Sequence, residues 1–201
     1  MESPVARNRA TYDVIAPMFA EQTKNPTTSV TEVATRFAED LPAGARVADV
    51  GCGPGRDTVL LRGLGLAVIG LDLSMGMLRA YGTPGLVQAD MRALPLSDGS
   101  VDGVWCQAAF LHIPKSDAAT VLGEFVRVLR PRGLLYLAVQ HGDGEGWEQV
   151  DYAPEYRRWF VSYREDELSA LLARAGFTVT AAEQESGFKR NWLTLRAIRV
   201  D

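Results

Sequence analysis

Three glycines stand at alternate positions directly after a short apolar run. Residues 46–50, Arg-Val-Ala-Asp-Val, lead into the turn Gly51-Cys52-Gly53-Pro54-Gly55, and residues 56–64 after it have the pattern of a helix. Glycine permits positive φ angles and a close approach of the backbone to a neighbour. A buried strand, a glycine-rich turn and a helix in this order predict an open α/β sheet with a ligand site at the carboxyl ends of its strands.

The same alternation continues along the chain, which has 201 residues and is long enough for one domain with a substantial core. Apolar runs cover residues 67–71, 86–89, 101–106 and 134–139, and helix-length segments cover residues 74–80 and 117–129. Short buried runs that alternate with helices are typical of βαβ units in a parallel sheet. The sequence shows no internal repeat and no domain boundary.

The two ends of the chain depart from this alternation. Residues 12–22 and 30–41 predict two helices ahead of the sheet. Ser162-Tyr163-Arg164-Glu165 resembles a capping box, which predicts a helix from there to Ala175 with Gly176 as its stop. Residues 177–182 and 192–200 then predict two strands joined by a polar turn around residues 185–187. Because no helix fits between these strands, they should pair antiparallel at a sheet edge.

Composition argues against several classes of function. A net charge of -4 offers no basic surface for nucleic acid or an anionic membrane, so we expect neither as a partner. Cys52 and Cys106 are far apart and the only histidines are His112 and His141, so no metal-ligand spacing is present. The sequence has no apolar run long enough to span a bilayer and residues 1–9 lack a signal-peptide core, which predicts a cytoplasmic protein.

Aspartates follow the next two predicted strands. Asp72 ends the second run, where a carboxylate accepts hydrogen bonds from ribose hydroxyls. Asp90 ends the third run, where it would accept from an exocyclic amine such as that of adenine. Tight packing or helix capping explains each signal alone, but three signals in register at successive strand ends favour a nucleoside site.

The spacing of the glycines also distinguishes between two classes of ligand. A nicotinamide-binding loop has the spacing G-x-G-x-x-G around a pyrophosphate, whereas this one is Gly51-x-Gly53-x-Gly55 with Asp49 just before it. An acidic residue there repels a diphosphate and suits the α-amino group of an amino acid. The pattern favours an adenosine joined to methionine over a dinucleotide.

On these residues the chain resembles the class I S-adenosylmethionine-dependent methyltransferases, in particular the small-molecule group called type 11. The matching segments are residues 47–55, 68–74, 88–91, 94–102 and 128–133. The resemblance implies an α/β fold with a single Rossmann-like doubly wound sheet of seven strands in the order 3-2-1-4-5-7-6, strand 7 antiparallel. It implies one methyltransferase domain over residues 1–201, divided into N-terminal cofactor-cap helices (1–44), a cofactor-binding core (45–141), an aromatic-rich substrate-side lid (142–163) and a C-terminal helix with an edge hairpin (164–201).

The resemblance also implies S-adenosyl-L-methionine as the cofactor, with S-adenosyl-L-homocysteine as its product. By this similarity the methionine end is held by Asp49, Gly51 and Gly53, the ribose by Asp72, and the adenine by Leu73, Asp90 and Met91. Gln107 would lie near the reacting sulfonium, and Tyr12 would close over the cofactor.

Methyl transfer from a sulfonium needs alignment and exclusion of water rather than a metal or a covalent nucleophile. A hydroxyl or ammonium acceptor would also need a base. His112, after the fourth predicted strand, is the candidate catalytic base and His141 is the second candidate. A histidine that only packs in a loop explains the sequence equally well.

Residues 142–163 are dense in aromatic side chains. The candidate substrate-binding residues there are Trp147, Tyr156, Trp159 and Tyr163. Such a segment is either a lid over an aromatic-walled pocket or a small helix packed on the sheet edge. Arg157 and Arg158 would favour an acidic acceptor and the carboxylates around them a cationic one, so the charge of the substrate stays open.

The sequence therefore predicts an enzyme, a monomer or homodimer, that transfers a methyl group to a small molecule by in-line displacement. Two alternatives stay open: a macromolecule (protein or RNA) methyltransferase, and a non-catalytic protein that binds S-adenosylmethionine. The net charge argues against the first alternative and the complete set of cofactor motifs against the second.

Overall fold

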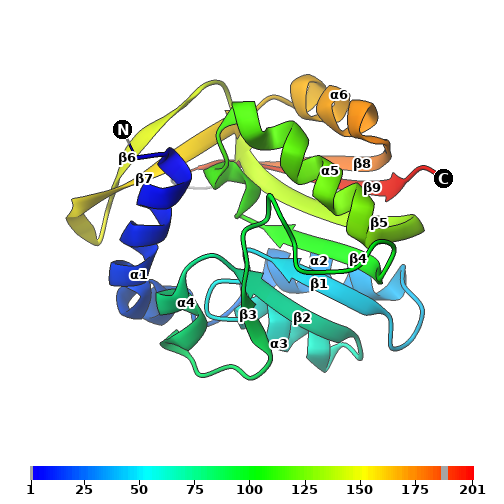
Figure 1. Ribbon diagram of the computed structural model, residues 1–201, viewed down its shortest axis with the longest axis horizontal. Helices are drawn as coiled ribbons and strands as arrows, with labels where there is room; N and C mark the ends of the chain where they lie inside the picture. The colour runs from blue at the N-terminus through cyan, green and yellow to red at the C-terminus, as the bar shows by residue number, and fades with distance from the viewer. Residues whose placement is uncertain (1, 187–189) are drawn as a thin grey trace.

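A mostly parallel sheet runs through the centre of the molecule (Figure 1). The computed structural model describes residues 2–186 and 190–201. Five parallel strands form the first part of the sheet: β1 (Arg46–Val50), β2 (Ala67–Asp72), β3 (Leu86–Gln88), β4 (Val101–Gln107) and β5 (Leu129–His141). Their spatial order is β3-β2-β1-β4-β5, so the predicted apolar runs are strands of one sheet.

Two further strands extend the sheet beyond β5, and the one next to β5 runs antiparallel to it. Strand β9 (Asn191–Arg199) pairs with β5 over the register Leu134↔Ile198 to Gln140↔Trp192, and β8 (Phe177–Ser186) pairs with β9. With β8 and β9 as strands 6 and 7, this confirms the expected order 3-2-1-4-5-7-6. Gly187, at the end of the predicted turn, lies outside the described residues.

The segment expected to be a lid or a small helix is a β-hairpin. Strands β6 (Glu145–Val150) and β7 (Ala153–Tyr163) pair antiparallel, and β7 joins the end of β5 in parallel through Gln140↔Ser162 and His141↔Tyr163. The described part of the chain therefore has nine strands rather than seven. The helix alternative is wrong because the two segments pair with each other as strands and residues 162–163 pair with β5, so tertiary pairing rather than the local sequence pattern decides the structure here.

The predicted capping box is wrong, although the helix after it is present. Ser162 lies in β7, where its backbone N–H donates to the carbonyl of Gly144 (2.9 Å), and α6 (Glu165–Ala175) begins after Arg164 without a side-chain cap. Acidic residues 165–167 occupy the first turn, where their negative charges interact favourably with the helix dipole and stabilise the helix. Gly176 ends the helix at a φ of 106°, as predicted.

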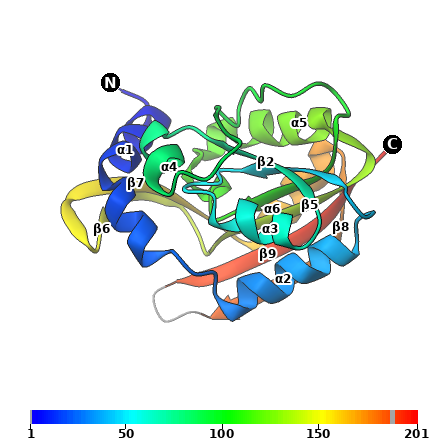
Figure 2. The same ribbon diagram turned by 90° about the horizontal axis from the view of Figure 1, so that it is seen from below.

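Helices cover both faces of the sheet (Figure 2). On one face α5 (Ala118–Val128) and α6 pack against β4 and β5, with Phe125 and Leu172 fully buried. On the other face α2 (Thr28–Glu39) and α3 (Arg56–Gly63) bury Phe37 and Leu61 against the same sheet. Because both faces are covered, the central strands are apolar on both sides, as their sequences indicated.

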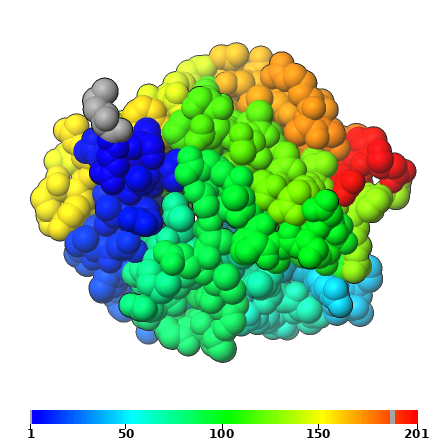
Figure 3. Space-filling model, in the orientation of Figure 1, coloured from blue at the N-terminus to red at the C-terminus, as the bar shows by residue number. Residues whose placement is uncertain are grey.

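Helix α1 (Pro4–Gln22) lies across the carboxyl ends of the strands, between α4 (Met75–Ala80) and the β6–β7 hairpin (Figures 1 and 3). It begins eight residues before the predicted start at Tyr12, because Ser3 caps it and Pro4 suits its first position. Within the described ranges, no helix combines the length and apolar character needed to cross a membrane.

A buried asparagine joins α1 to β7. The Nδ2 of Asn8 donates to the carbonyl of Trp159 (3.1 Å), and the Trp159 N–H donates to Oδ1 of Asn8 (2.7 Å). At the other side of the helix, Asp13 Oδ1 accepts from the hydroxyl of Ser74 (2.7 Å) and from Gly76 N (2.9 Å). These contacts fix α1 over the sheet.

Asn8→Ala should lower the free energy of unfolding by about 1–3 kcal/mol, because it leaves the backbone N–H of Trp159 without a partner in a buried site and takes one of two donors from its carbonyl. Urea unfolding followed by circular dichroism measures the change. Asn25→Ala, the same substitution at an exposed position between α1 and α2, is the control and should have little effect. Equal losses in the two variants would contradict the role of Asn8.

Candidate functional site

The glycine loop after β1 is built on positive φ angles. Gly51, Gly53 and Gly55 have φ values of 74°, 54° and 90°, which side chains with a Cβ rarely adopt. A Cβ on Gly51 would lie 2.1 Å from Cβ of Ala109, so this position also needs glycine for space. At Gly53 the nearest atom to such a Cβ would be Cε1 of Phe19 at 3.9 Å. The loop thus leaves open space beside Gly53 for a ligand.

Asp72, at the end of β2, is bound to this loop. Its Oδ2 accepts a hydrogen bond from Gly53 N (2.8 Å), and its Oδ1 accepts from Ser74 N (2.8 Å). Burial raises the pKa of Asp72, although the same backbone hydrogen bonds act to lower it. Each carboxylate oxygen keeps a second lone pair for a ligand. Asp72 is therefore placed to hold both the loop and a polyhydroxyl group.

A small, mostly apolar pocket of about 90 Å³ lies beside Asp72. Its walls include Val50, Leu73, Asp90 and Met91, which end or follow β1, β2 and β3. The predicted adenine residues are thus brought together. Its size and its apolar walls suit the edge of a flat ring.

The Asp90 carboxylate is already engaged by a residue that sequence reasoning missed. Arg92 donates from Nη2 to Oδ2 (2.7 Å) and from Nε to Oδ1 (3.1 Å), and its Nη1 pairs with Asp117 (2.9 Å). Burial opposes ionisation of Asp90, but the hydrogen bonds from Arg92 outweigh it and lower the pKa. The spacing Asp-x-Arg was the only signal in the sequence. The role of Asp90 toward adenine stays a prediction.

Asp49 is buried, with a relative exposure of 1%, and it lines the central cavity described below. The hydroxyl of Thr58 donates to its Oδ2 (2.5 Å). Burial, and then the charge of nearby Asp57, raise the pKa of Asp49 to about 8. An ammonium group beside Asp49 would relieve this penalty by favouring the carboxylate. The predicted role at the amino end of methionine is therefore electrostatically sound.

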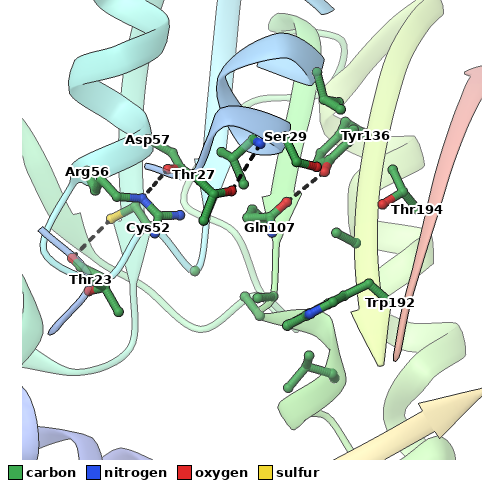
Figure 4. Close-up of a pocket in the computed structure, with 18 of the residues that line it drawn as sticks. Thr23, Thr27, Ser29, Cys52, Arg56, Asp57, Gln107, Tyr136, Trp192 and Thr194 are labelled. Carbon is green, nitrogen blue, oxygen red and sulfur yellow. Dashed lines mark hydrogen bonds and ion pairs between the residues drawn. The ribbon is translucent and has the colours of Figure 1, made fainter. Parts of the chain in front are cut away.

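A central cavity of about 1090 Å³ lies at the carboxyl ends of β1 and β4. Its lining comes from α1, the cap of α2, the glycine loop, α3 and four strands. In chain order these residues include Tyr12, Phe19, Thr27, Gly53, Arg56, Asp57, Gln107, Tyr136, Arg158, Phe160, Trp192 and Thr194. Figure 4 shows Arg56 and Asp57 on one side and Trp192 and Thr194 on the opposite side. Gln107 is fixed there by the hydroxyl of Tyr136, which donates to its Oε1 (2.7 Å).

His112 and Tyr12 meet in the wall that the central cavity and the small pocket share. The His112 Nδ1 lies 2.7 Å from the carbonyl oxygen of Trp159, and its Nε2 lies 2.7 Å from the Tyr12 hydroxyl. Because a carbonyl only accepts, Nδ1 bears the hydrogen, and in the neutral ring Nε2 accepts from Tyr12. Burial lowers the pKa of His112 to about 3 despite the hydrogen bond to Trp159. Both ring nitrogens are occupied, so His112 positions Tyr12 and has no free lone pair for an acceptor.

Comparison with known proteins agrees with this geometry. Residues 48–137 match the family model of the methyltransferase domain. The malonyl-[acyl-carrier protein] O-methyltransferase of Laribacter hongkongensis is 32% identical over 202 residues, which cover 90% of this chain and 66% of the relative. The ubiquinone biosynthesis O-methyltransferase of Xanthomonas oryzae is 35% identical over 48% of this chain and 43% of the relative. This chain thus spans less than two thirds of the length of these curated relatives.

A solved structure has the same fold. The 1,6-didemethyltoxoflavin-N1-methyltransferase of Burkholderia thailandensis, crystallised with 1,6-didemethyltoxoflavin and S-adenosylhomocysteine, superposes with a TM-score of 0.76 at 21% identity. The match covers 100% of this chain and 92% of that one. Residues 48–137 belong to the methyltransferase-domain family, and the fold is that of the class I S-adenosylmethionine-dependent methyltransferases. This confirms the family and the fold class that the sequence motifs implied.

The predicted substrate residues of this methyltransferase-family chain lie apart from the central cavity. Trp147 and Trp159 face each other across the hairpin with ring centroids 5.4 Å apart, and Tyr156 packs with Ile15 under α1. Tyr163 is fully buried and stacks on Phe110. None of the four predicted side chains lines the cavity, so their substrate role stays a prediction without support from this geometry.

The hairpin instead contributes Arg158 and Phe160, the neighbours of Trp159 in sequence, to the cavity wall. Strand β9 contributes Trp192. Successive side chains of a strand point to opposite faces, so a strand assigned to residues 153–163 would have put Arg158 and Phe160 on one face and Trp159 on the other. Among the residues that the structure describes, no cluster of His, Cys, Asp and Glu is arranged to hold a metal ion.

His112 should keep its neutral Nδ1–H tautomer from about pH 5 to pH 8, because its pKa of about 3 lies below this range. Long-range ¹H–¹⁵N NMR of the imidazole distinguishes this tautomer from the protonated ring, and the spectrum of His112→Gln assigns the signals. A protonated ring at pH 5 or 6 would contradict the hydrogen-bond arrangement.

Proposed function

We propose that this protein is an S-adenosylmethionine-dependent methyltransferase with a small-molecule acceptor. One observation supports this most: the open glycine loop, the Asp72 carboxylate and the apolar pocket lie side by side at the carboxyl ends of β1, β2 and β3. The pocket and the central cavity share Gly51 and Asp72 in their walls. A ligand with an apolar ring, a sugar and a charged tail fits such a path.

Each part of the cofactor has a matching region in this proposal. Leu73 and Met91 would enclose the adenine, and Asp72 would accept from the ribose hydroxyls. Asp49 and the backbone at Gly53 would hold the methionine end in the central cavity. The residues present therefore fit the group, and a diphosphate would meet the acidic Asp49 and Asp57 instead.

The chemistry is a displacement at a methyl carbon. S-adenosylmethionine supplies a methyl group on a positively charged sulfur that leaves as a neutral thioether. A lone pair of the acceptor forms the new bond to the methyl carbon, while the C–S bond breaks and its electrons stay on sulfur. The protein would contribute alignment and exclusion of water, and we assign these roles to Tyr12, Gln107 and the covering helix α1, which border the cavity.

The acceptor is a small molecule in this proposal. The central cavity, at about 1090 Å³, is large enough for the methionine end of the cofactor together with a second compound of modest size. The named relatives include enzymes for a carrier-linked malonyl group and for ubiquinone biosynthesis. The net charge of -4 disfavours nucleic acid as an acceptor.

Calorimetric titration with S-adenosylmethionine, S-adenosylhomocysteine and NADH tests the cofactor. We expect affinities on the order of micromolar for both adenosyl ligands and no heat from NADH. Binding of NADH alone would replace the methyltransferase proposal with an oxidoreductase. No binding of either adenosyl ligand would also overturn the proposal.

Asp72→Ala should weaken S-adenosylhomocysteine binding by roughly tenfold or more, because a charge-assisted contact to the ribose is lost. The same titration measures it, and circular dichroism verifies the fold. The control is Asp98→Ala, whose side chain is 82% exposed and lines neither the central cavity nor the small pocket. Unchanged affinity in a folded Asp72→Ala protein would refute the ribose assignment.

A further inference from the structure

Arg158 places a positive charge in the wall of the central cavity. It extends from β7 and lies among aromatic rings, with its guanidinium carbon 5.1 Å from the centroid of Phe160 and 5.5 Å from that of Tyr12. The side chain is partly exposed, and the Nε of its guanidinium is buried. Aromatic faces attract a cation, but they accept few of its five N–H donors.

The other arginines of the cavity wall have carboxylate partners. Arg56 pairs with Asp57 (2.6 Å), Arg190 with Glu148 (2.6 Å), and Arg36 with Glu183 (3.8 Å). Within residues 2–186 and 190–201, Arg158 forms no ion pair of this kind. Asp151 acts on the Arg158 charge at longer range, but Arg158 is the one arginine of the described cavity wall without a carboxylate in direct contact.

The hydrogen bonds of Arg158 are also incomplete. Nη1 donates to the hydroxyl of Tyr12 (3.2 Å). Nε is buried and has no hydrogen-bond partner among the described residues. A desolvated guanidinium with unused donors is costly unless an acceptor completes it, and a carboxylate matches its planar, forked geometry.

Among the described residues, the side chains that are hydrogen-bonded in line with Arg158 offer no free base. The Tyr12 hydroxyl accepts from Arg158 and donates to His112, and His112 donates to the Trp159 carbonyl. In this series of hydrogen bonds each group donates to the next one, starting from Arg158. The acceptor nitrogen of His112 is therefore occupied by the Tyr12 hydroxyl and has no lone pair left to take a proton. Such a site suits a compound that is already an anion when it enters.

From these contacts we propose that Arg158 binds a carboxylate of the methyl acceptor, which is therefore a small organic acid. The side chains of Phe160 and Trp192, in the same cavity wall, would contact its apolar part. This inference rests on the proposed methyltransferase function and adds the chemical class of the acceptor. A carboxylic acid is ionised at neutral pH, since its ordinary pKa is about 4, whereas a phenol would still need a base.

The test compares carboxylates with their uncharged primary amides, which have nearly the same shape. The probes are benzoate and benzamide, phenylacetate and phenylacetamide, and hexanoate and hexanamide. Each is titrated by ligand-observed NMR into protein saturated with S-adenosylhomocysteine. In wild-type protein we expect at least one carboxylate to bind about fivefold or more tightly than its amide, since a charged partner for the guanidinium strengthens the contact.

Arg158→Met should remove this preference, and Arg158→Lys should keep part of it, because an ammonium retains the charge without the fork. Arg157→Met is the matched control: this neighbour is exposed and does not line the cavity. The control should keep the wild-type preference. The proposal is overturned if no carboxylate binds wild-type protein better than its amide, or if Arg158→Met keeps the preference.

The two proposals fail in different ways. Affinity for S-adenosylhomocysteine, measured on its own, reports on the methyltransferase function and should be equal in wild-type and Arg157→Met proteins. If wild-type protein does not bind that ligand, the same pairs are titrated without it, and the comparison of wild-type and Arg158→Met still decides the role of Arg158.

Discussion

The parallel register between β1 and β2 is the constraint on which the ligand site depends. Beyond the last ladder pair, Val50↔Leu71, the N–H groups of Gly51 and Cys52 both donate to the carbonyl of Leu71 (2.7 and 3.1 Å). The turn therefore starts while it is still bound to β2, which brings Gly53 N to the Asp72 carboxylate. Neither the loop nor Asp72 would have this geometry alone, because each is held by the other.

A second set of contacts builds the acceptor side from distant parts of the chain. Asn8 fixes α1 to β7 through both backbone groups of Trp159, and the same carbonyl accepts from His112. Tyr12 and Arg158 then complete a line of hydrogen bonds across the cavity wall. Residues of α1 and β7 are more than a hundred positions apart in the sequence. The wall that they form therefore depends on the docking of α1 onto the hairpin rather than on local contacts.

Local patterns were sufficient where a single strand or turn decides the outcome. The apolar runs, the helix stop at Gly176 and the positions of Gly51, Gly53 and Asp72 all follow from residues close together in the chain. The hairpin at residues 145–163 was missed because aromatic density was interpreted as a pocket wall. In β7 the large aromatic residue at 159 faces away from the cavity and its neighbours face into it, so side-chain size alone gave the wrong face.

The strand order followed from the resemblance to a known family, whereas the sequence by itself determined the strands and the three strand ends that meet at the cofactor site. These depend on hydrophobic periodicity and on glycine backbone freedom, which are local properties. Only the tertiary structure decided that Asp90 is bound by Arg92, that both nitrogens of His112 are occupied, and that the charge of Arg158 has no carboxylate partner in the described cavity wall. Burial and hydrogen-bond partners set these properties, and both arise from residues that meet only when the chain has folded.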